Sequence, residues 1–413
     1  MKIDKIKLKN AMTMNGINNQ ADLALVLERS KYYVSSIFKG KDIAKNEIIY
    51  ISNKLKVIPS DLIPDSEKKN YYIDVNLSKN KKEITSIELF AGAGGLALGL
   101  EKAGIKTKAF VEIDKTCCET LKLNRPNWNI INDDVSCVDF KKYKGKIDLV
   151  TGGFPCQAFS YAGKKLGFND IRGTMFYEFA RCIKEVEPLM FMGENVRGLK
   201  SHDNGRTLTT ILDILAGLGY TVQYKVLNAS NYGVAQKRER IVIIGTKNGY
   251  DLKFNYPKPY KKVTLLKDVL KGCPLSEGQK YSENKRKVLE LVPPGGCWID
   301  LPIEIQKKYM GKSFYSGGGK RGMARRISWD EPCLTLTCSP SQKQTERCHP
   351  DETRPFTVRE YARIQSFPDS WEFAGKMGDK YKQIGNAVPV ELARNIGNSI
   401  LECLLEYKNR EEI

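Results

Sequence analysis

Residues 84–100 read ITSIELFAGAGGLALGL, and this stretch indicates the fold class. A short apolar run leads into Gly92, Gly94 and Gly95, and a helical pattern begins at Leu96. Glycines let the backbone turn tightly and approach a ligand at the N-terminus of the following helix. The pattern is typical of the first strand, turn and helix of a nucleotide-binding α/β fold, although loose glycine spacing alone is weakly specific.

Further apolar runs follow at intervals that leave room for helices. They are KAFVEID at 108–114, IDLVTGGF at 147–154, PLMFMGENV at 188–196 and RERIVIIGT at 238–246. Helical patterns occur between these runs, for example at 96–103 and 176–186. Strands separated by helix-length segments predict a mostly parallel, doubly wound α/β sheet.

The composition changes along the chain and divides it into expected segments. A helical domain at 1–65 and a lysine-rich linker at 66–83 precede the main α/β domain at 84–255. The segment 256–378 is rich in Pro, Gly and Lys, which predicts a smaller lobe of loops and short strands. Residues 379–413 carry a helical pattern again and are expected to return to the α/β domain.

The 413-residue chain carries 67 Lys and Arg against 48 Asp and Glu, a formal net charge of +19. This excess favours a polyanionic partner, with nucleic acid first and an anionic membrane surface second; a lysine-rich solvated surface is the alternative. No apolar run approaches the roughly 18 residues of a membrane span, so we expect a cytoplasmic protein without a membrane partner. The eleven cysteines are then expected to be reduced thiols.

Two acidic residues follow strands at positions suited to a nucleoside. Glu112 ends the second strand, about 20 residues after Gly92, where a carboxylate can accept hydrogen bonds from ribose hydroxyls. Asp134 ends the expected third strand. These features imply an adenosine-containing cofactor, and both NAD and S-adenosylmethionine fit them.

The stretch GGFPCQAFS at 152–160 sets Cys156 between a proline and a glutamine. A thiol with a pKa of ~8.5 is a strong nucleophile once activated, although a lone cysteine can equally serve packing. Glu194 ends the next strand, and because parallel strands end along one edge, we expect it to share a cleft with Cys156. In QKRER, Arg238 and Arg240 alternate at strand period and would point to one side, where guanidinium groups hold phosphate or a carbonyl oxygen. A solvated charge run is the alternative for QKRER.

Several motifs together resemble the DNA (cytosine-5) methyltransferases of bacterial restriction–modification systems. They are FAGAGG, VEID, GGFPCQAFS, RGTMF, ENV, QKRER, TVREYARIQSFPDSW and QIGNAVPV, in the family's order between residues 87 and 390. The resemblance implies a doubly wound, Rossmann-like, S-adenosylmethionine-dependent methyltransferase domain with a smaller target-recognition lobe. It also implies a short specific site in double-stranded DNA as the substrate.

The resemblance implies roles for individual residues. Cys156 would attack C6 of a target cytosine flipped out of the duplex, so that C5 becomes the nucleophile that takes the methyl group. Glu194 would bind the N3 and amino edge of the base. Arg240 would hold O2, and Arg238 would steady the same region.

The implied cofactor site consists of Phe90, Gly92, Gly94, Glu112, Ile113, Asp134, Val135, Phe154, Met175 and Asn386. Within it, Glu112 would take the ribose hydroxyls and Asp134 the adenine amino group. Ile113 stands where many relatives place an aromatic residue against the adenine. The implied DNA contacts near the nucleophile are Gln157, Ser160, Lys164, Lys165 and Arg172. Residues 161–173 would form a mobile loop that closes over the DNA.

The N-terminal domain has a second resemblance, to the helix-turn-helix of Cro and phage-repressor-like proteins. The residues that carry it are Gln20, Ala24, Ser30, Val34 and Ile37. The face expected to be buried in the first of these helices consists of Leu23, Val26 and Leu27. Ser30 is a plausible N-cap for the helix that would enter the major groove, with Lys31, Tyr32 and Ser35 facing DNA. Glu28 occupies the position of the usual turn glycine. We expect this domain to repress the chain's own operon or that of a partner nuclease; a bundle for packing or dimerisation is the alternative.

In the family, target recognition lies between the QKRER and TVREYARIQ segments. The run RRISWDEPCLTLTCSPSQKQTERCHP at 325–350 supplies many side chains suited to reading base edges. It resembles enzymes that read short GC-rich palindromes of the GGNCC or GGWCC kind. Cys333, Cys338, Cys348 and His349 are irregularly spaced without a CxxC pair, so no metal site is expected.

Other functions fit parts of the sequence. The same machinery could methylate structured RNA, although the polar recognition segment and the N-terminal domain favour DNA. A transcriptional regulator with a degenerate enzyme domain is disfavoured by the intact Cys156, Glu194 and Arg240, and a nicotinamide oxidoreductase leaves PCQ, ENV and QKRER unexplained. We expect a catalytic monomer, with a dimer through residues 1–65 as the alternative, and a cognate restriction endonuclease linked only by function.

Overall fold

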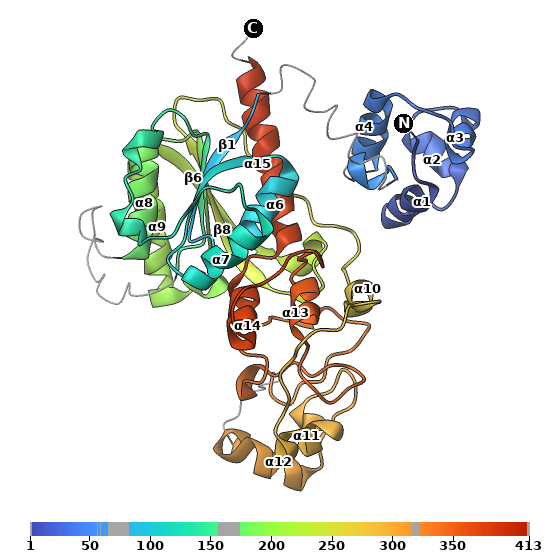
Figure 1. The fold of residues 1–413 in the computed structure, drawn as a ribbon, viewed down its shortest axis with the longest axis vertical. Helices are drawn as coiled ribbons and strands as arrows, with labels where there is room; N and C mark the ends of the chain where they lie inside the picture. The colour runs from blue at the N-terminus through green and yellow to red at the C-terminus, as the bar shows by residue number, and fades with distance from the viewer. Residues whose placement is uncertain are drawn as a thin grey trace. The chain divides into compact units, whose positions relative to one another are not determined.

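The computed structural model describes residues 2–55, 57, 59–64, 82–155, 174–315 and 322–410. The chain divides into two compact units, Met1–Lys82 and Glu83–Ile413, which are both drawn in Figure 1. Each unit has hydrophobic core residues of its own.

The regular elements described in the first unit are all helical. They are α1 (Lys5–Met14), α2 (Gln20–Val26), α3 (Lys31–Phe38), α4 (Lys45–Lys54) and the 3-10 turn η1 (Pro59–Asp61). Ser30 caps α3 as predicted, since its side chain accepts a hydrogen bond from the Tyr33 amide at 3.1 Å. Leu23 and Leu27 are buried, but the expectation for Val26 was wrong, because this side chain is 36% exposed. Leu23 and Leu27 lie one turn apart on the core face, and Val26 is rotated by about 100° from Leu27 toward solvent.

A seven-stranded sheet crosses the second unit in the order β3-β2-β1-β4-β5-β8-β6. The strands are β1 (Thr85–Leu89), β2 (Lys106–Val111), β3 (Ile130–Ile131), β4 (Leu149–Gly152), β5 (Met190–Val196), β6 (Tyr220–Asn228) and β8 (Glu239–Lys247). The pairs among β1 to β5 are parallel as predicted, whereas β8 runs antiparallel to both β5 and β6. The segment joining β6 to β8 is too short for the crossover that a parallel pair requires. The sheet is therefore mixed, and its register sets Arg240 at the start of β8 opposite Val196 at the end of β5.

Helices cover both faces of this sheet, as Figure 1 shows. They are α6 (Gly95–Ala103), α7 (Lys115–Asn124), α8 (Met175–Val186), α9 (Arg206–Gly217) and α15 (Val390–Arg410). Two further helices, α13 (Val358–Ile364) and α14 (Met377–Asn386), pack against each other beside the sheet. On one face, Phe179 of α8 and Ile211 of α9 share a core with Ile243 of the sheet. On the other face, Leu100 of α6 and Ile396 of α15 belong to a second core. This layered arrangement is the doubly wound architecture predicted from the alternating pattern.

The smaller lobe has a limited core of its own. Its elements include α10 (Leu266–Leu270), α11 (Glu283–Glu290), α12 (Ile303–Met310) and β9 (Cys333–Leu334), which pairs with β7 (Gln236–Lys237). The buried core residues are Tyr281, Leu289, Val292, Leu301, Ala324 and Cys348. The buried Arg326 guanidinium donates to the carbonyl oxygens of Leu289 and Val292 and so ties this lobe together. Tyr361 of α13 belongs to a different core, shared with Leu98 of α6 and Leu121 of α7.

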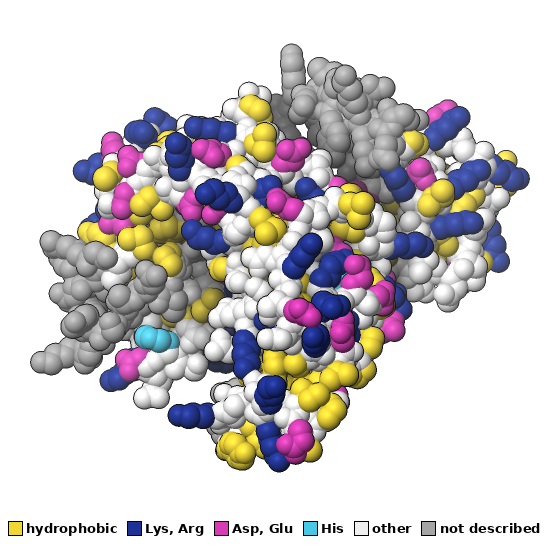
Figure 2. Space-filling model, turned by 60° about the horizontal axis from the view of Figure 1, so that its bottom comes forward, with side chains coloured by type: hydrophobic (Ala, Val, Ile, Leu, Met, Phe, Trp, Pro, Cys, Tyr) yellow, Lys and Arg dark blue, Asp and Glu magenta, His cyan; other side chains and the backbone are white. Residues whose placement is uncertain are grey.

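Three further observations concern the surface, the helices and metal-binding side chains. Figure 2 shows lysine and arginine side chains spread over the visible face, with acidic and apolar side chains between them. No helix within the described ranges is long and apolar enough to cross a membrane. In the same part of the chain, no three His, Cys, Asp or Glu side chains gather in a way that could hold a metal ion.

Candidate active site

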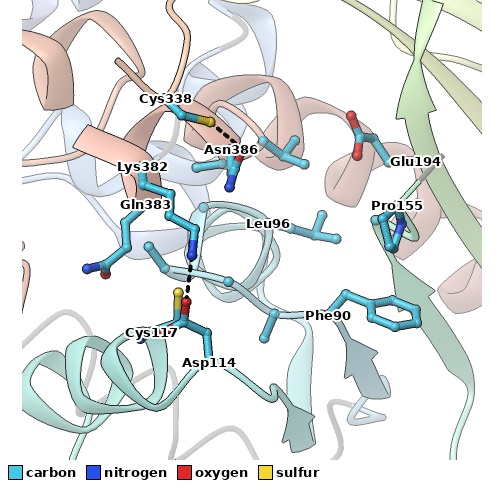
Figure 3. Close-up of a pocket in the computed structure, with 18 of the residues that line it drawn as sticks. Phe90, Leu96, Asp114, Cys117, Pro155, Glu194, Cys338, Lys382, Gln383 and Asn386 are labelled. Atoms are coloured by element: carbon cyan, nitrogen blue, oxygen red, sulfur yellow. Dashed lines mark hydrogen bonds and ion pairs between the residues drawn. The ribbon is translucent and has the colours of Figure 1, made fainter. Parts of the chain in front are cut away.

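A cavity of about 690 Å³ lies at the carboxyl ends of the parallel strands. Its lining comes from the loop after β1, the ends of β2, β4 and β5, the β7–β8 turn, residues 335–338 and the end of α14, and Figure 3 draws many of these residues. The strand order reverses between β1 and β4, and ligands of open α/β sheets bind at such a reversal. The volume lies within the range of about 300–1,000 Å³ that is usual for small-molecule sites.

The glycine-rich loop forms one wall of the cavity through unusual backbone angles. Phe90 has φ 57° and Gly92 has φ 54°, and both residues line the cavity. Gly94 has φ 87°, and a Cβ there would lie 2.7 Å from Leu121 Cδ2 and 2.9 Å from Trp371 Cζ2. Gly94 is not among the lining residues, so its role in this structure is to let α6 start against α7 and Trp371.

Glu112 presents a fixed carboxylate at the end of β2. One oxygen accepts a hydrogen bond from the Gly92 amide at 2.7 Å, and the other accepts one from the Asp114 amide at 2.8 Å. A carboxylate has further acceptor positions, which suit the two hydroxyls of a ribose. Asp114 also lines the cavity, caps α7 and pairs with Lys382 Nζ of α14 at 3.1 Å (Figure 3).

The other residues expected at the cofactor divide into two groups. Phe154 and Asn386 line the cavity, and Asn386 Oδ1 accepts a hydrogen bond from Cys338 Sγ at 2.9 Å. Gly94, Ile113, Asp134, Val135 and Met175 are not part of the lining. Ile113 is 66% exposed, and Asp134 accepts hydrogen bonds from the amide and hydroxyl of Ser136, which lower its pKa.

The prediction did not include several residues that line the cavity. They are Asp114, Thr116, Cys117, Lys382, Gln383 and Val388, together with residues 335–338. Those outside 335–338 lie within the VEID and QIGNAVPV motifs or up to three residues from them, so these motifs were the available signal.

Glu194 and Arg240 form an ion pair on the opposite side of the cavity. Arg240 Nε lies 2.8 Å from Glu194 Oε1, and each side chain is 12% exposed. The carboxylate also lies against the end of β4, because a Cβ on Gly153 would be 2.9 Å from Glu194 Oε2. Burial raises the pKa of Glu194, while the positive charges of Arg240 and Arg238 act against this rise.

Arg238 also lines the cavity, but it is bonded differently from Arg240. It is 2% exposed, and its two terminal nitrogens donate to the carbonyl oxygens of Leu336 at 3.1 Å and Gly385 at 2.8 Å. Its Nε has no hydrogen-bond partner among the described residues. Burial, together with the charge of Arg240, lowers the pKa of Arg238 to about 9.

The predicted nucleophile Cys156 lies outside the described residues, which stop at Pro155 and resume at Thr174. The same is true of Gln157, Ser160, Lys164, Lys165 and Arg172. Pro155 lines the cavity, and Asn195 of β5 holds the preceding residue by donating to the Phe154 carbonyl at 2.9 Å. The residue directly before the predicted nucleophile therefore lies in the same cavity as Glu194.

Comparison with known proteins agrees with this geometry. Residues 84–402 match the model of the C-5 cytosine-specific DNA methylase family. The type II methyltransferase M.Sau96I of Staphylococcus aureus is 51% identical over 98% of this chain and 100% of its own length. M.Eco47II of Escherichia coli is 59% identical over 79% of this chain and 81% of its own length. A DNMT2 variant from Spodoptera frugiperda, 17% identical, has the same fold, with a TM-score of 0.57 over 78% of this chain and 100% of that protein.

The family match covers most of the chain, including every strand that contributes to the cavity. The cofactor of this family is S-adenosylmethionine, and the remaining acceptor positions of the Glu112 carboxylate fit the hydroxyls of its ribose. The chain belongs to the C-5 cytosine-specific DNA methylase family and is an S-adenosylmethionine-dependent DNA (cytosine-5) methyltransferase.

Proposed function

We propose that this enzyme methylates C5 of a cytosine within a short duplex site through a covalent bond between Cys156 and C6, and that it protects DNA in a type II restriction–modification system. The observation that carries the mechanism is the buried Glu194–Arg240 pair in the same cavity as Glu112. The S. aureus and E. coli relatives are type II methyltransferases by name, which supports the biological role.

The chemistry requires activation of C5, which is a poor nucleophile in cytosine. The Cys156 thiolate forms a bond to C6, and the π electrons of the C5–C6 bond move toward C5. S-adenosylmethionine, when bound, supplies the electrophilic methyl group. Methyl transfer leaves S-adenosylhomocysteine. Water then takes the C5 proton, the electrons of the C5–H bond restore the C5–C6 double bond and the Cys156 thiolate leaves, so the enzyme returns to its starting state once the products depart.

Glu194 and Arg240 are suited to the charge that this addition places on the ring. A raised pKa favours the protonated carboxyl of Glu194, which can donate a hydrogen bond to N3 while its other oxygen accepts one from the amino group. Arg240 can donate to O2 from the adjacent strand position. Both groups are fixed by the sheet before the base arrives, so little reorganisation is needed.

The substrate base must leave the duplex to reach these groups. The face of a stacked base is inaccessible, and flipping costs a few kcal/mol. The concave cavity supports this step because Glu194 and Arg240 lie within it and not on a flat surface. We further propose that the run at 325–350 reads a GC-rich palindrome of the GGNCC or GGWCC kind.

For the first unit we propose a helix-turn-helix function. Glu28, at the position of the usual turn glycine, has φ 52°, and its carboxylate pairs with Lys54 at 2.5 Å. Tyr32 is 83% exposed on the side of α3 away from the buried Val34, and Lys31 is also exposed. These positions support major-groove contacts by Lys31, Tyr32 and Ser35, and a role in repressing the chain's own operon or the nuclease gene.

The enzyme proposal is tested with tritiated S-adenosylmethionine and duplex DNA, beside a Cys156→Ala control. Transfer that disappears in the control, with 5-methylcytosine mapped by sequencing, supports the nucleophile and reveals the target. Transfer to structured RNA and not to duplex DNA would contradict the proposed substrate. The regulatory proposal is tested separately by deleting residues 1–65, and promoter binding that survives the deletion would refute it.

A further inference from the structure

The peptide of Leu336 is held by side chains at both of its polar groups. Its amide donates to Gln236 Oε1 at 3.0 Å, and its carbonyl oxygen accepts from Arg238 at 3.1 Å. Leu336 lines the cavity and follows β9, which pairs with β7 through only two residues on each strand. Because this pairing is so short, the hydrogen bonds from Gln236 and Arg238 are important for holding the Leu336 backbone in place.

Both side chains continue to a second wall of the same cavity. Gln236 Nε2 donates to Gln365 Oε1 at 3.0 Å, and Gln365 Nε2 donates to the Ile384 carbonyl at 2.8 Å. The other terminal nitrogen of Arg238 donates to the Gly385 carbonyl at 2.8 Å. The two routes end on consecutive residues of α14, immediately before Asn386, which lines the cavity.

The three bridging side chains are almost completely enclosed. Gln236 and Gln365 are 0% exposed, and Arg238 is 2% exposed. Water does not replace a bond broken at such a depth, so a buried amide or guanidinium that loses its partner remains unsatisfied. The two walls also touch directly, since a Cβ on Gly385 would lie 2.6 Å from the Thr337 carbonyl oxygen. Residues 336–337 and 384–386 therefore resist moving independently.

We propose that Gln236, Arg238 and Gln365 form a polar brace that couples DNA binding to cofactor binding. The inference rests on the proposed function, in which the segment containing Leu336 engages the target DNA, while Asn386 belongs to the cofactor side of the cavity. A shift of Leu336 on DNA binding must carry residues 384–386 with it or break enclosed hydrogen bonds. The three residues are positioning residues, because they act through the backbone that they hold.

The coupling is measured as a ratio of dissociation constants. S-adenosylhomocysteine is titrated calorimetrically into the full-length enzyme, alone and with a duplex carrying the site mapped by sequencing. In the native enzyme, bound duplex should lower the dissociation constant of S-adenosylhomocysteine by a factor on the order of 10. In Gln365→Met the ratio should fall clearly below the native value, because the relay from Gln236 to Ile384 is lost while Arg238 still joins Leu336 to Gly385. Tyr220→Phe is the matched control: it removes another buried hydrogen bond, to the Pro188 carbonyl at 2.8 Å, and should keep the native ratio.

A second variant keeps the test decisive if Gln365→Met does not fold. The double variant Gln236→Met/Gln365→Met removes both side-chain amides together, so neither is left facing an unpaired amide, and only the Leu336 amide and the Ile384 and Ala387 carbonyls lose a bond. We expect this variant to fold and to show a coupling ratio below the native value. Native coupling in a folded variant without the glutamine relay would refute the brace, as would a native ratio of one. If the native enzyme methylates no duplex, the proposed function fails and the brace fails with it. Methyl transfer with coupling unchanged in the variants would refute the brace alone.

Discussion

Replacing Arg240 by methionine should leave Glu194 as a buried carboxylate without its closest partner. The two side chains meet at 2.8 Å and are 12% exposed each. Breaking a buried pair from one side costs about 3–5 kcal/mol, because the remaining charge stays out of water. The slight exposure of this pair places the expected loss in the free energy of unfolding near the lower end, at ~3 kcal/mol.

The loss should depend on pH in one direction. Burial already raises the pKa of Glu194 against the opposition of Arg240 and Arg238, and removing Arg240 raises it further. A carboxyl whose folded-state pKa exceeds its unfolded value of about 4.3 carries no penalty below that value and an increasing penalty as pH rises toward the folded pKa. The loss in the free energy of unfolding should therefore be smaller at about pH 5 than at about pH 8.

Urea unfolding followed by tryptophan fluorescence measures this loss in the second unit alone, because all four tryptophans lie between residues 83 and 413. Adding Glu194→Gln to Arg240→Met should recover much of the loss at the higher pH, since no buried charge remains. Arg197→Met is the matched control: it breaks an exposed pair with Glu239 at 2.6 Å and should cost less than about 1 kcal/mol. An equal loss for Arg240→Met at both pH values would refute the reasoning.

Three further predictions concern Glu112 at the cavity and two residues of the neighbouring strand and turn, Glu88 and Gly94. Glu112→Gln should weaken S-adenosylhomocysteine binding on the order of tenfold in calorimetry, because the charged acceptor held by the Gly92 amide is lost; unchanged affinity would contradict the assigned role. Burial raises the pKa of Glu88, whose oxygens have no hydrogen-bond partner among the described residues, so Glu88→Gln should stabilise the enzyme by about 1 kcal/mol or more near about pH 8 and by less near about pH 5. A gain in the free energy of unfolding that does not change with pH would contradict a raised pKa for Glu88. Gly94→Ala should cost about 2–3 kcal/mol in urea unfolding, because φ is 87° and the new Cβ would press on Leu121; a stable variant would be inconsistent with this packing.

Local pattern accounts for what could be predicted from the sequence. The alternation of apolar runs and helical segments correctly indicated β1 to β5, because hydrophobic periodicity is a property of neighbouring residues. Ser30 was recognisable as a cap because capping involves an amide only three positions on. Glu112 and Glu194 were identifiable because they end strands whose carboxyl ends share an edge.

Features that depend on contacts between distant residues could not be predicted from the sequence. Val26 satisfied the apolar spacing of α2 but faces solvent, since burial depends on which other helices pack against it. Lys382 directly precedes the QIGNAVPV motif but is far along the chain from Asp114, with which it pairs at the cavity. Strand alternation grouped Arg238 with Arg240, yet Arg238 donates to two backbone carbonyls and Arg240 pairs with a carboxylate.

The sequence by itself determined the succession of strands and helices along the chain, the glycine turn and the identity of the strand-end carboxylates, because each depends on residues close together in the chain. Only the tertiary structure decided that β8 runs antiparallel and so brings Arg240 to Glu194. It also decided that Gln236, Arg238 and Gln365 meet in the interior. The physical reason is the same in each case: buried polar groups must find partners, and which partners are within reach depends on how distant elements pack.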